Sequence, residues 1–204
     1  MLHLQTVKPH TLGILKSIMA IPELIDFNLA GGTSLALQIG HRESYDLDFF
    51  GNRPFTSDEI LHLLSGISPI EIAHKTTNIL TLLVDGVKVD FVNFKYPILR
   101  DPIYWEGTRL LQLPDIGAMK LSAITGRGKK RDFFDFYFLL QTYSFAELME
   151  FYRQKFADGN EWLIARSISY FTDAEEDEDP NLYLETNWIE VKESISKEAL
   201  LYFG

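Results

Sequence analysis

Two aspartates, Asp46 and Asp48, lie two residues apart in the segment Tyr45–Phe50, which reads YDLDFF. Alternating acidic and apolar residues are typical of a β-strand, in which residues i and i+2 point to the same face of the sheet. The two carboxylates can therefore both reach one pair of divalent metal ions. Carboxylate oxygens are hard ligands that Mg²⁺ takes together with phosphate oxygens and water.

A third carboxylate, that of Asp90, lies in the apolar run Val87–Phe94, directly after the turn signal Asp85–Gly86. We expect this run to be a neighbouring strand that brings Asp90 close to the first two aspartates. Each acidic feature alone is also compatible with the exposed face of an edge strand. Taken together, Asp46, Asp48 and Asp90 are predicted to be catalytic residues that bind a divalent metal, Mg²⁺ or Mn²⁺.

Two glycines, Gly31 and Gly32, precede a short segment with helical spacing, Thr33–Ile39. Backbone N–H groups and the dipole at a helix N-terminus favour bound phosphate, and Thr33 or Ser34 can add a hydroxyl. A Gly-Gly pair alone is a weak signal. Followed by the aspartate-bearing strands, it predicts a site for a nucleoside triphosphate and metal, as nucleotidyl transfer requires.

Basic residues gather in the segment 127–131, which reads RGKKR, and Lys120 lies in an expected helix before it. The Lys120 ammonium can reach a β- or γ-phosphate as a point charge. Two less specific interpretations stay open. The basic segment is also compatible with a solvated helix end, and Asp132 and Asp135 with charges that only stabilise the next helix N-terminus.

His41 and Arg42 come shortly before the paired aspartates. Arg42 can contact phosphate or pair with a nearby carboxylate. No second histidine stands at the spacing of a zinc ligand, so we expect a structural or positioning role for His41.

The elements that must position these residues change in kind along the chain. Besides the two aspartate-bearing strands, we expect strands at Ile70–Thr76 and Ile79–Val84, and helices at 11–20, 33–39 and 57–65. After Pro97 we expect helices at 113–124, 129–143, 145–156, 160–171 and 187–202. The sequence therefore predicts an α+β protein with an α/β core at residues 1–111 and a helical domain at residues 112–204.

The composition narrows the classes of partner. The net charge of the 204 residues is −10, which argues against broad nucleic-acid binding but leaves room for a local basic patch. The acidic segment Asp173–Asp179, DAEEDED, is expected to be a solvated loop. There is no cysteine and no apolar stretch of about 18 residues, and we expect no signal peptide. We expect a cytoplasmic protein that does not interact with a membrane.

Three segments resemble the AbiEii/AbiGii toxin family, which belongs to the DNA polymerase β-like nucleotidyltransferase superfamily. They are GGTSLALQIGHRESYDLDFF (Gly31–Phe50), VKVDFVNF (Val87–Phe94) and DIGAMKLSAITGRGKKRDFFDFYFLL (Asp115–Leu140). The resemblance covers about residues 10 to 145. Thr33 stands where many superfamily members have serine. Because threonine also carries a hydroxyl, this departure keeps the functional group.

The resemblance implies a polymerase β-like core, a mixed twisted sheet with flanking helices, followed by a helical domain that closes a nucleotide cleft. It implies that Asp46, Asp48 and Asp90 hold metal and that Asp90 helps to deprotonate the attacking hydroxyl. Asp132 would orient Lys120 or Arg131, or contact the base or ribose. The expected nucleotide-binding residues are Gly31, Gly32, Thr33, Arg42, Lys120, Arg131 and Asp132.

The function that this resemblance implies is metal-dependent transfer of a nucleoside monophosphate from an NTP to an acceptor hydroxyl on RNA, for example tRNA, or on a protein. The protein would be the toxin of a type IV toxin–antitoxin or abortive-infection system, with an antitoxin partner. Three alternatives stay open: a non-catalytic nucleotide- or partner-binding module of the same fold, a small-molecule nucleotidyltransferase, and a metal-dependent nuclease. A nuclease would leave the glycine-bounded phosphate site unexplained.

Overall fold

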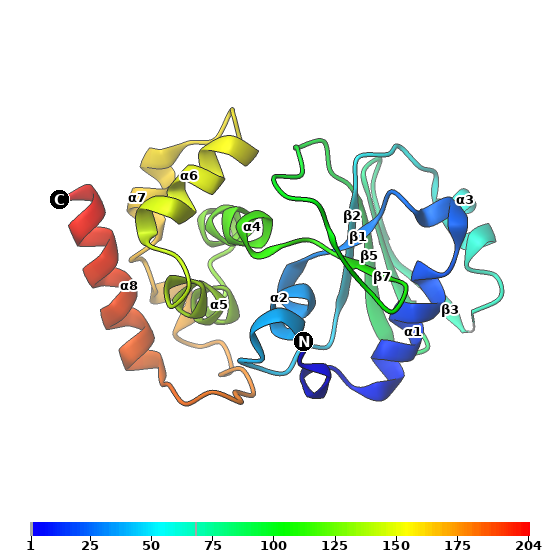
Figure 1. Ribbon diagram of the computed structural model, residues 1–204, viewed down its shortest axis with the longest axis horizontal. Helices are drawn as coiled ribbons and strands as arrows, with labels where there is room; N and C mark the ends of the chain where they lie inside the picture. The colour runs from blue at the N-terminus through cyan, green and yellow to red at the C-terminus, as the bar shows by residue number, and fades with distance from the viewer. Residues whose placement is uncertain (1, 68) are drawn as a thin grey trace.

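A mixed sheet and a group of helices make up the two halves of the computed structural model, which describes residues 2–67 and 69–204 (Figure 1). The expected first domain, residues 1–111, includes residues 1 and 68, which lie outside the described residues. The strands are β1 (Asn28–Leu29), β2 (Leu47–Gly51), β3 (Ile70–Lys75), β4 (Ile79–Val84), β5 (Val87–Asn93), β6 (Ile103–Trp105) and β7 (Thr108–Leu110). The helices are α1 (Pro9–Met19), α2 (Gly31–Ile39), α3 (Ser57–Leu63), α4 (Leu113–Gly126), α5 (Lys130–Leu140), α6 (Phe145–Lys155), α7 (Glu161–Ser167) and α8 (Trp188–Phe203).

The seven strands form one sheet in the order β3-β4-β5-β2-β1-β7-β6. At its centre, β2 and β5 pair in parallel, and the register places Asp48 beside Asp90. The pairs β2–β1, β5–β4, β4–β3 and β7–β6 are antiparallel, whereas β1 and β7 are parallel. This mixed sheet with helices confirms the expected α+β class.

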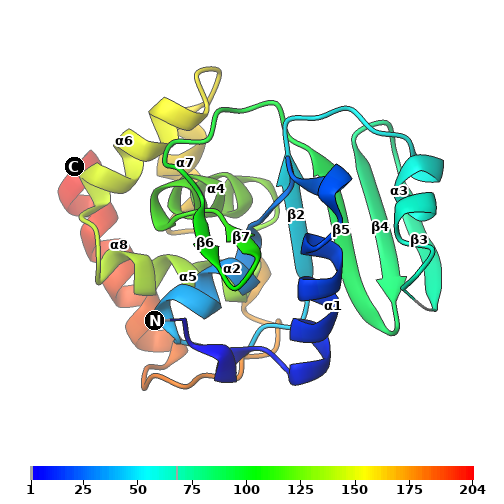
Figure 2. The same ribbon diagram turned by 45° about the vertical axis from the view of Figure 1, so that its right-hand side comes forward.

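Helices cover the two faces of the sheet differently. Figures 1 and 2 show α1 and α3 over one face, and α2 and α4 on the other side. The alternating residues Leu47 and Phe49 of β2 are fully buried, and Phe49 stacks on Phe91 of β5 at 5.2 Å between ring centroids. The polar face of β2 therefore turns toward α4, and the aspartates on it point into the region between the sheet and the helices.

Local signals explain several elements. The β4–β5 hairpin turns at Asp85 and Gly86, both with positive φ (47° and 78°), as the Asp-Gly signal predicts. The Thr56 hydroxyl accepts a hydrogen bond from Glu59 N at 3.1 Å and caps α3. Phe133, Phe134 and Phe136 of α5 are core residues, as expected for a helix with so many aromatic side chains.

Other elements differ from the expectation. Helix α2 begins at Gly31, so the glycines lie in its first turn, and β2 begins at Leu47, one residue after Asp46. Helix α7 ends at Ser167 rather than near residue 171. The β6–β7 hairpin was not expected, because strands of three residues are too short to show alternation.

The acidic segment Asp173–Asp179 is only partly a solvated loop. The Asp177 carboxylate accepts hydrogen bonds from Lys130 N at 3.0 Å and from Lys129 Nζ at 3.1 Å. Helix α5 has no side-chain cap at its own N-cap residue, so this carboxylate from a distant segment takes that role. Among the described residues, no helix is long and apolar enough to cross a membrane.

Candidate active site

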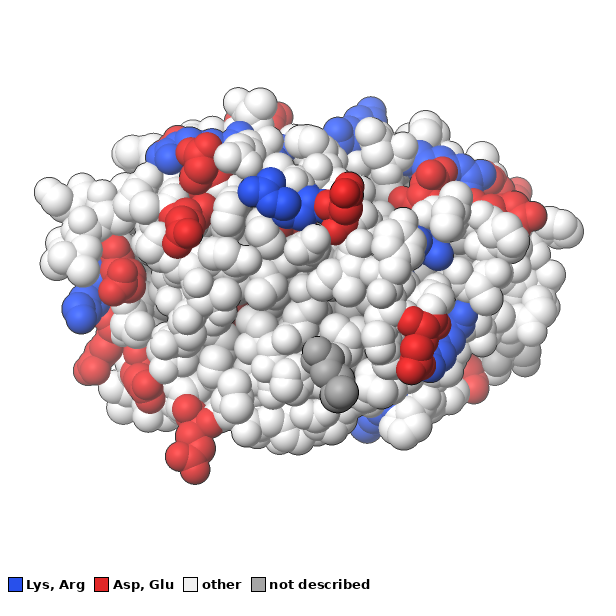
Figure 3. Space-filling view, viewed as in Figure 1, with Lys and Arg blue, Asp and Glu red and all other residues white. Residues whose placement is uncertain are grey.

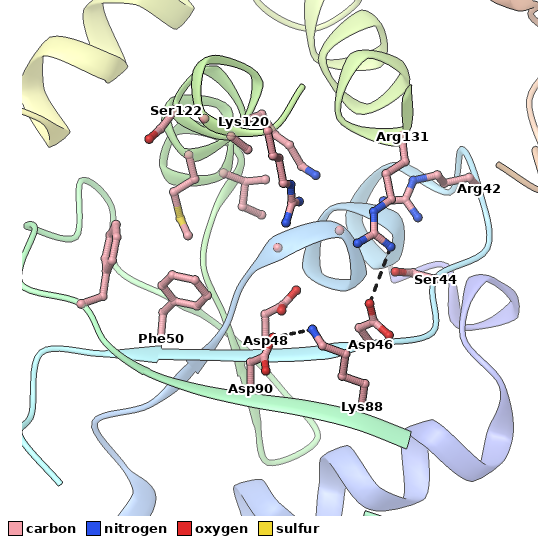
Figure 4. A pocket seen from close by; sticks show the side chains of 18 of the residues that line it. Arg42, Ser44, Asp46, Asp48, Phe50, Lys88, Asp90, Lys120, Ser122 and Arg131 are labelled. Carbon is pink, nitrogen blue, oxygen red and sulfur yellow. Dashed lines mark hydrogen bonds and ion pairs between the residues drawn. The ribbon is translucent and has the colours of Figure 1, made fainter. Parts of the chain in front are cut away.

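A cleft of about 350 Å³ lies between the polar face of the sheet and helices α4 and α5 (Figure 4). This volume is in the range of small-molecule binding sites. Its sheet side carries Asp46, Asp48, Lys88 and Asp90, and the glycines of α2 border it. The other lining residues are Arg42, Ser44, Phe50, Phe94, Ile116, Met119, Lys120, Ser122, Ala123, Gly126, Arg127, Arg131 and Phe156.

The three predicted carboxylates come together in this cleft. Asp48 and Asp90 are register partners on β2 and β5, and Asp46 lies just before β2. Burial, with the nearby negative charge of Asp90 as the next cause, raises the pKa of Asp48 to about 6. A cation bound between these carboxylates would relieve both effects.

Lys88 is a cleft residue that sequence reasoning missed. Its Nζ atom lies 2.6 Å from Asp90 Oδ2. A signal was present, since Lys88 and Asp90 are two residues apart in the strand pattern VKVDF and therefore share a face. The other oxygen, Asp90 Oδ1, is buried and has no hydrogen-bond partner among the described residues.

The first two residues of α2 have to be glycine because neighbouring side chains leave no room for a Cβ atom. Gly31 has a φ of +63°, and a Cβ atom on it would lie 2.0 Å from Asp48 Oδ2. A Cβ atom on Gly32 would lie 2.3 Å from Arg42 Nη2. The absence of side chains thus lets the first turn of α2 approach the acidic face of the sheet and Arg42, while its backbone borders the cleft.

Thr33 has a different position from the one expected for a phosphate ligand. It is buried, and it is not among the described residues that line the cleft. Its hydroxyl donates to the backbone carbonyl of Asp46 and shares a hydrogen bond of 2.8 Å with Ser44 Oγ. Thr33 therefore fixes the backbone that carries Asp46, and Ser44 supplies the hydroxyl that borders the cleft.

Arg42 pairs with Asp135 of α5 through two hydrogen bonds, from Nε to Oδ1 at 2.7 Å and from Nη2 to Oδ2 at 2.8 Å. His41 Nε2 lies 2.7 Å from the same Oδ1. All three side chains are buried. Burial alone would raise the pKa of Asp135, but the charges of Arg42 and Lys120 outweigh it and hold that pKa well below its usual range. The pair joins the loop before β2 to the helical half.

Lys120 and Asp132 form a second buried pair behind the cleft. Lys120 Nζ lies 2.9 Å from Asp132 Oδ1 and also contacts Asp135 Oδ2 at 2.5 Å. Arg127 donates to Asp132 through Nε at 2.8 Å and Nη2 at 3.0 Å. Asp132 is fully buried and is not among the described lining residues, so it orients the two cations. Arg127 lines the cleft but was not among the expected nucleotide-binding residues.

The basic segment 127–131 divides between two surfaces. Arg131 lines the cleft, is about half exposed, and has its Nη1 atom 3.6 Å from Asp46 Oδ2 (Figure 4). Lys129 instead contacts Asp177, and Lys130 contacts Asp179 at 3.1 Å. Arg127 and Arg131 are therefore the members of this segment that oppose the carboxylates.

The donor atoms fit a hard divalent cation. The cleft contains oxygen ligands from carboxylates, among them the unpartnered Asp90 Oδ1, and the ionised form of Asp48 is disfavoured without added positive charge. Within the described ranges, no group of three or more histidine, aspartate or glutamate side chains is placed so that it could hold a metal ion. Since Mg²⁺ commonly takes one or two carboxylates with phosphates and water, the arrangement suits an ion that binds together with a nucleotide.

The mixed sheet with its flanking helices matches solved structures of the nucleotidyltransferase fold. A candidate nucleotidyltransferase from H. pylori aligns with a TM-score of 0.58 at 21% sequence identity, over 98% of this chain and 92% of that chain. JHP933 from Helicobacter pylori aligns with a TM-score of 0.57 at 20% identity, over 98% and 89% of the respective chains.

Comparison of the amino-acid sequence with known families shows which family this chain belongs to. The family model described as nucleotidyl transferase AbiEii toxin, type IV TA system, matches residues 13–201, and this chain belongs to that family. An uncharacterized protein of Aquifex aeolicus strain VF5 is 33% identical in an alignment that covers 92% of this chain and 93% of that protein. The family match confirms the resemblance and extends it through the helices beyond Tyr143, where the sequence showed no usable motif.

Proposed function

We propose that this protein transfers a nucleoside monophosphate from an NTP to an acceptor hydroxyl on RNA or protein and releases pyrophosphate. The observation that carries the proposal is that Asp46, Asp48 and Asp90 line one cleft together with Arg127 and Arg131. A triphosphate has the charge to bridge these walls, with its oxygens toward the arginines and a cation between it and the carboxylates.

Asp46, Asp48 and Asp90 would hold two divalent ions, Mg²⁺ or Mn²⁺. When bound, the two ions would neutralise the triphosphate, activate the attacking hydroxyl and stabilise the leaving pyrophosphate. Asp90 is the residue we assign to help remove the proton of the acceptor hydroxyl. Its Oδ1 atom is free of partners among the described residues, whereas Oδ2 is held by Lys88.

Arg127 and Arg131 are the cations that we assign to the phosphates, because both line the cleft with about half of the side chain exposed. Their planar guanidinium groups can contact two phosphate oxygens at once. Lys120 and Arg42 also border the cleft, but each is buried against Asp135. We assign to them a fixed positive potential behind the phosphates, and to Gly31 and Gly32 the backbone approach from α2.

The biological role that we propose follows the family. The protein would be the toxin of a type IV toxin–antitoxin system, its effect would be opposed by an antitoxin partner, and it would act in the cytoplasm, where NTPs and RNA are present. On the face shown in Figure 3, acidic and basic side chains of the described residues are interspersed and no broad basic patch forms. With a net charge of −10, the cleft-facing arginines are the local contact that we assign to an RNA acceptor.

The test is a labelling experiment with purified protein, Mg²⁺, each of the four α-labelled NTPs, and either total RNA including tRNA or total cellular protein. We expect label in one acceptor class with the wild type and none with an Asp46→Asn, Asp48→Asn double variant. Asp101→Asn is the matched control, because Asp101 is an exposed aspartate outside the cleft lining. Label in RNA or in protein identifies the acceptor.

Absence of label, with intact Mg²⁺-dependent ATP binding, would overturn the transfer reaction and favour a non-catalytic nucleotide-binding module. Shortening of the RNA on a stained gel, without incorporation of label, would favour a nuclease. Absence of ATP binding by the folded wild type would overturn the assignment of the site itself.

A further inference from the structure

The cleft changes in character along its length, and β2 shows the change on one wall. Asp48 and Phe50 share a face of this strand and both line the cleft. Because a strand rises by about 3.3 Å per residue, the backbone positions of Asp48 and Phe50 lie about 7 Å apart. The wall therefore passes from carboxylate to aromatic ring over a distance close to that between a nucleotide's α-phosphate and its base.

Helix α4 forms the opposite wall and changes in the same direction. Its lining residues near the N-terminal half, Ile116 and Met119, are apolar, whereas Arg127 follows its C-terminal end. Met119 and Arg127 are separated by about 12 Å along the helix axis, at 1.5 Å per residue. Figure 4 shows Phe50 at one end of the cleft and Asp46 with Arg131 at the other.

The apolar end is built from three aromatic rings that come from separate elements. Phe50 of β2 packs edge-on against Phe94, which follows β5, at 5.0 Å between centroids. Phe94 contacts Phe156, which follows α6, at 6.2 Å. The Lys155 ammonium lies 5.3 Å from the Phe94 ring and is fixed by a buried ion pair of 2.7 Å with Asp115. The rings are thus held in place before any ligand binds.

We propose that this apolar end is the nucleobase subsite of the cleft, with the partly exposed Phe50, Phe94 and Met119 at its surface and the buried Phe156 and Ile116 in the core against which they pack. The nucleotide then lies along β2, with its base against Phe50 and its triphosphate directed toward Arg131. This assignment rests on the proposed function. Because every base has an aromatic face, loss of the Phe50 ring weakens the binding of all four NTPs.

The test separates the base from the phosphates by comparing two probes, Mg·ATP and Mg·tripolyphosphate, which lacks both base and ribose. Titration calorimetry measures each Kd for the wild type and for Phe50→Leu, which keeps an apolar side chain but removes the ring. We expect Phe50→Leu to weaken ATP binding about tenfold and to leave tripolyphosphate binding unchanged. Arg131→Gln should weaken the binding of both probes.

The matched control is Tyr104→Leu, which removes an exposed ring on β6 and should change neither Kd. Thermal melting of each variant checks that it is folded. Unchanged ATP binding by folded Phe50→Leu, or an equal loss for both probes, would overturn the subsite while leaving the proposed function intact. Failure of the wild type to bind either probe would instead overturn the proposed function.

Discussion

Lys88 Nζ lies 2.6 Å from Asp90 Oδ2, and both side chains come from the same face of β5. The lysine supplies positive charge to a cleft wall on which three carboxylates converge. It holds one oxygen of Asp90 and leaves Oδ1 buried without a partner among the described residues. Lys88 is 42% exposed, so the pair lies at the border between the cleft and solvent.

Replacing Lys88 with methionine should strengthen Mn²⁺ binding severalfold. The ammonium repels a divalent ion that binds to the same carboxylates, and partial exposure to solvent limits this repulsion to about 1 kcal/mol. Titration of the nucleotide-free protein with Mn²⁺ measures the effect. Lys88→Arg keeps the charge and should bind Mn²⁺ like the wild type. Weaker Mn²⁺ binding by Lys88→Met would show that the lysine instead organises the ion site.

Asp48→Asn should stabilise the metal-free protein at neutral pH. The pKa of Asp48 in the folded protein, about 6, lies above its usual 3.8, so the folded state binds the proton more tightly than the unfolded state. Stability is therefore lost as pH rises from about 4 to about 6. At pH 7 the free energy of unfolding of the variant should exceed that of the wild type by about 1 to 3 kcal/mol. The lower values apply because Asp48 is partly exposed to the cleft.

Urea unfolding at pH 4 and pH 7 measures this difference, which should vanish at pH 4. Mg·ATP should raise the Tm of the wild type at pH 7 but not that of Asp48→Asn. A variant that is less stable than the wild type at pH 7 would contradict the electrostatic assignment of Asp48.

Asp135→Asn should destabilise the protein by about 3–5 kcal/mol, because the buried Arg42 and Lys120 lose their charged partner. The pKa of Asp135 is held well below its usual range, so its stabilising effect is full above about pH 4 and is lost only as pH falls further. The decrease in the free energy of unfolding caused by Asp135→Asn should thus be constant between pH 5 and pH 8. Denaturant unfolding checks it, with Asp101→Asn as the surface control expected to change little.

Gly31→Ala should lose Mg·ATP binding and destabilise the protein by about 1–3 kcal/mol, because alanine disfavours the positive φ and its Cβ meets Asp48. The matched control is Gly13→Ala in the interior of α1, where an added Cβ meets nothing within 4 Å. That change should stabilise the protein by about 0.5–1 kcal/mol. Equal effects of the two substitutions on unfolding would contradict this account of the first turn of α2.

Much of the site could be predicted from patterns that involve only a few neighbouring residues. Alternation predicts that Asp46 and Asp48 face the same way, and both line the cleft although Asp46 lies one residue before β2. Asp85–Gly86 specifies the hairpin that returns the chain through Asp90. The dense aromatic helix α5 has to be buried because it exposes too much apolar surface otherwise. These conclusions hold wherever the elements pack, since they depend on local geometry and on composition.

The partners of the charged residues depended on the tertiary structure. Arg42 and Asp135 are 93 residues apart, and Lys155 and Asp115 are 40 apart. Periodicity indicates which face of a helix or strand is polar. The partner that this polar face contacts is decided by how the helices and the sheet pack together. The packing turned Thr33 inward, buried Asp132 behind two cations, and divided the basic segment so that Arg131 faces the cleft while Lys129 and Lys130 contact the acidic segment.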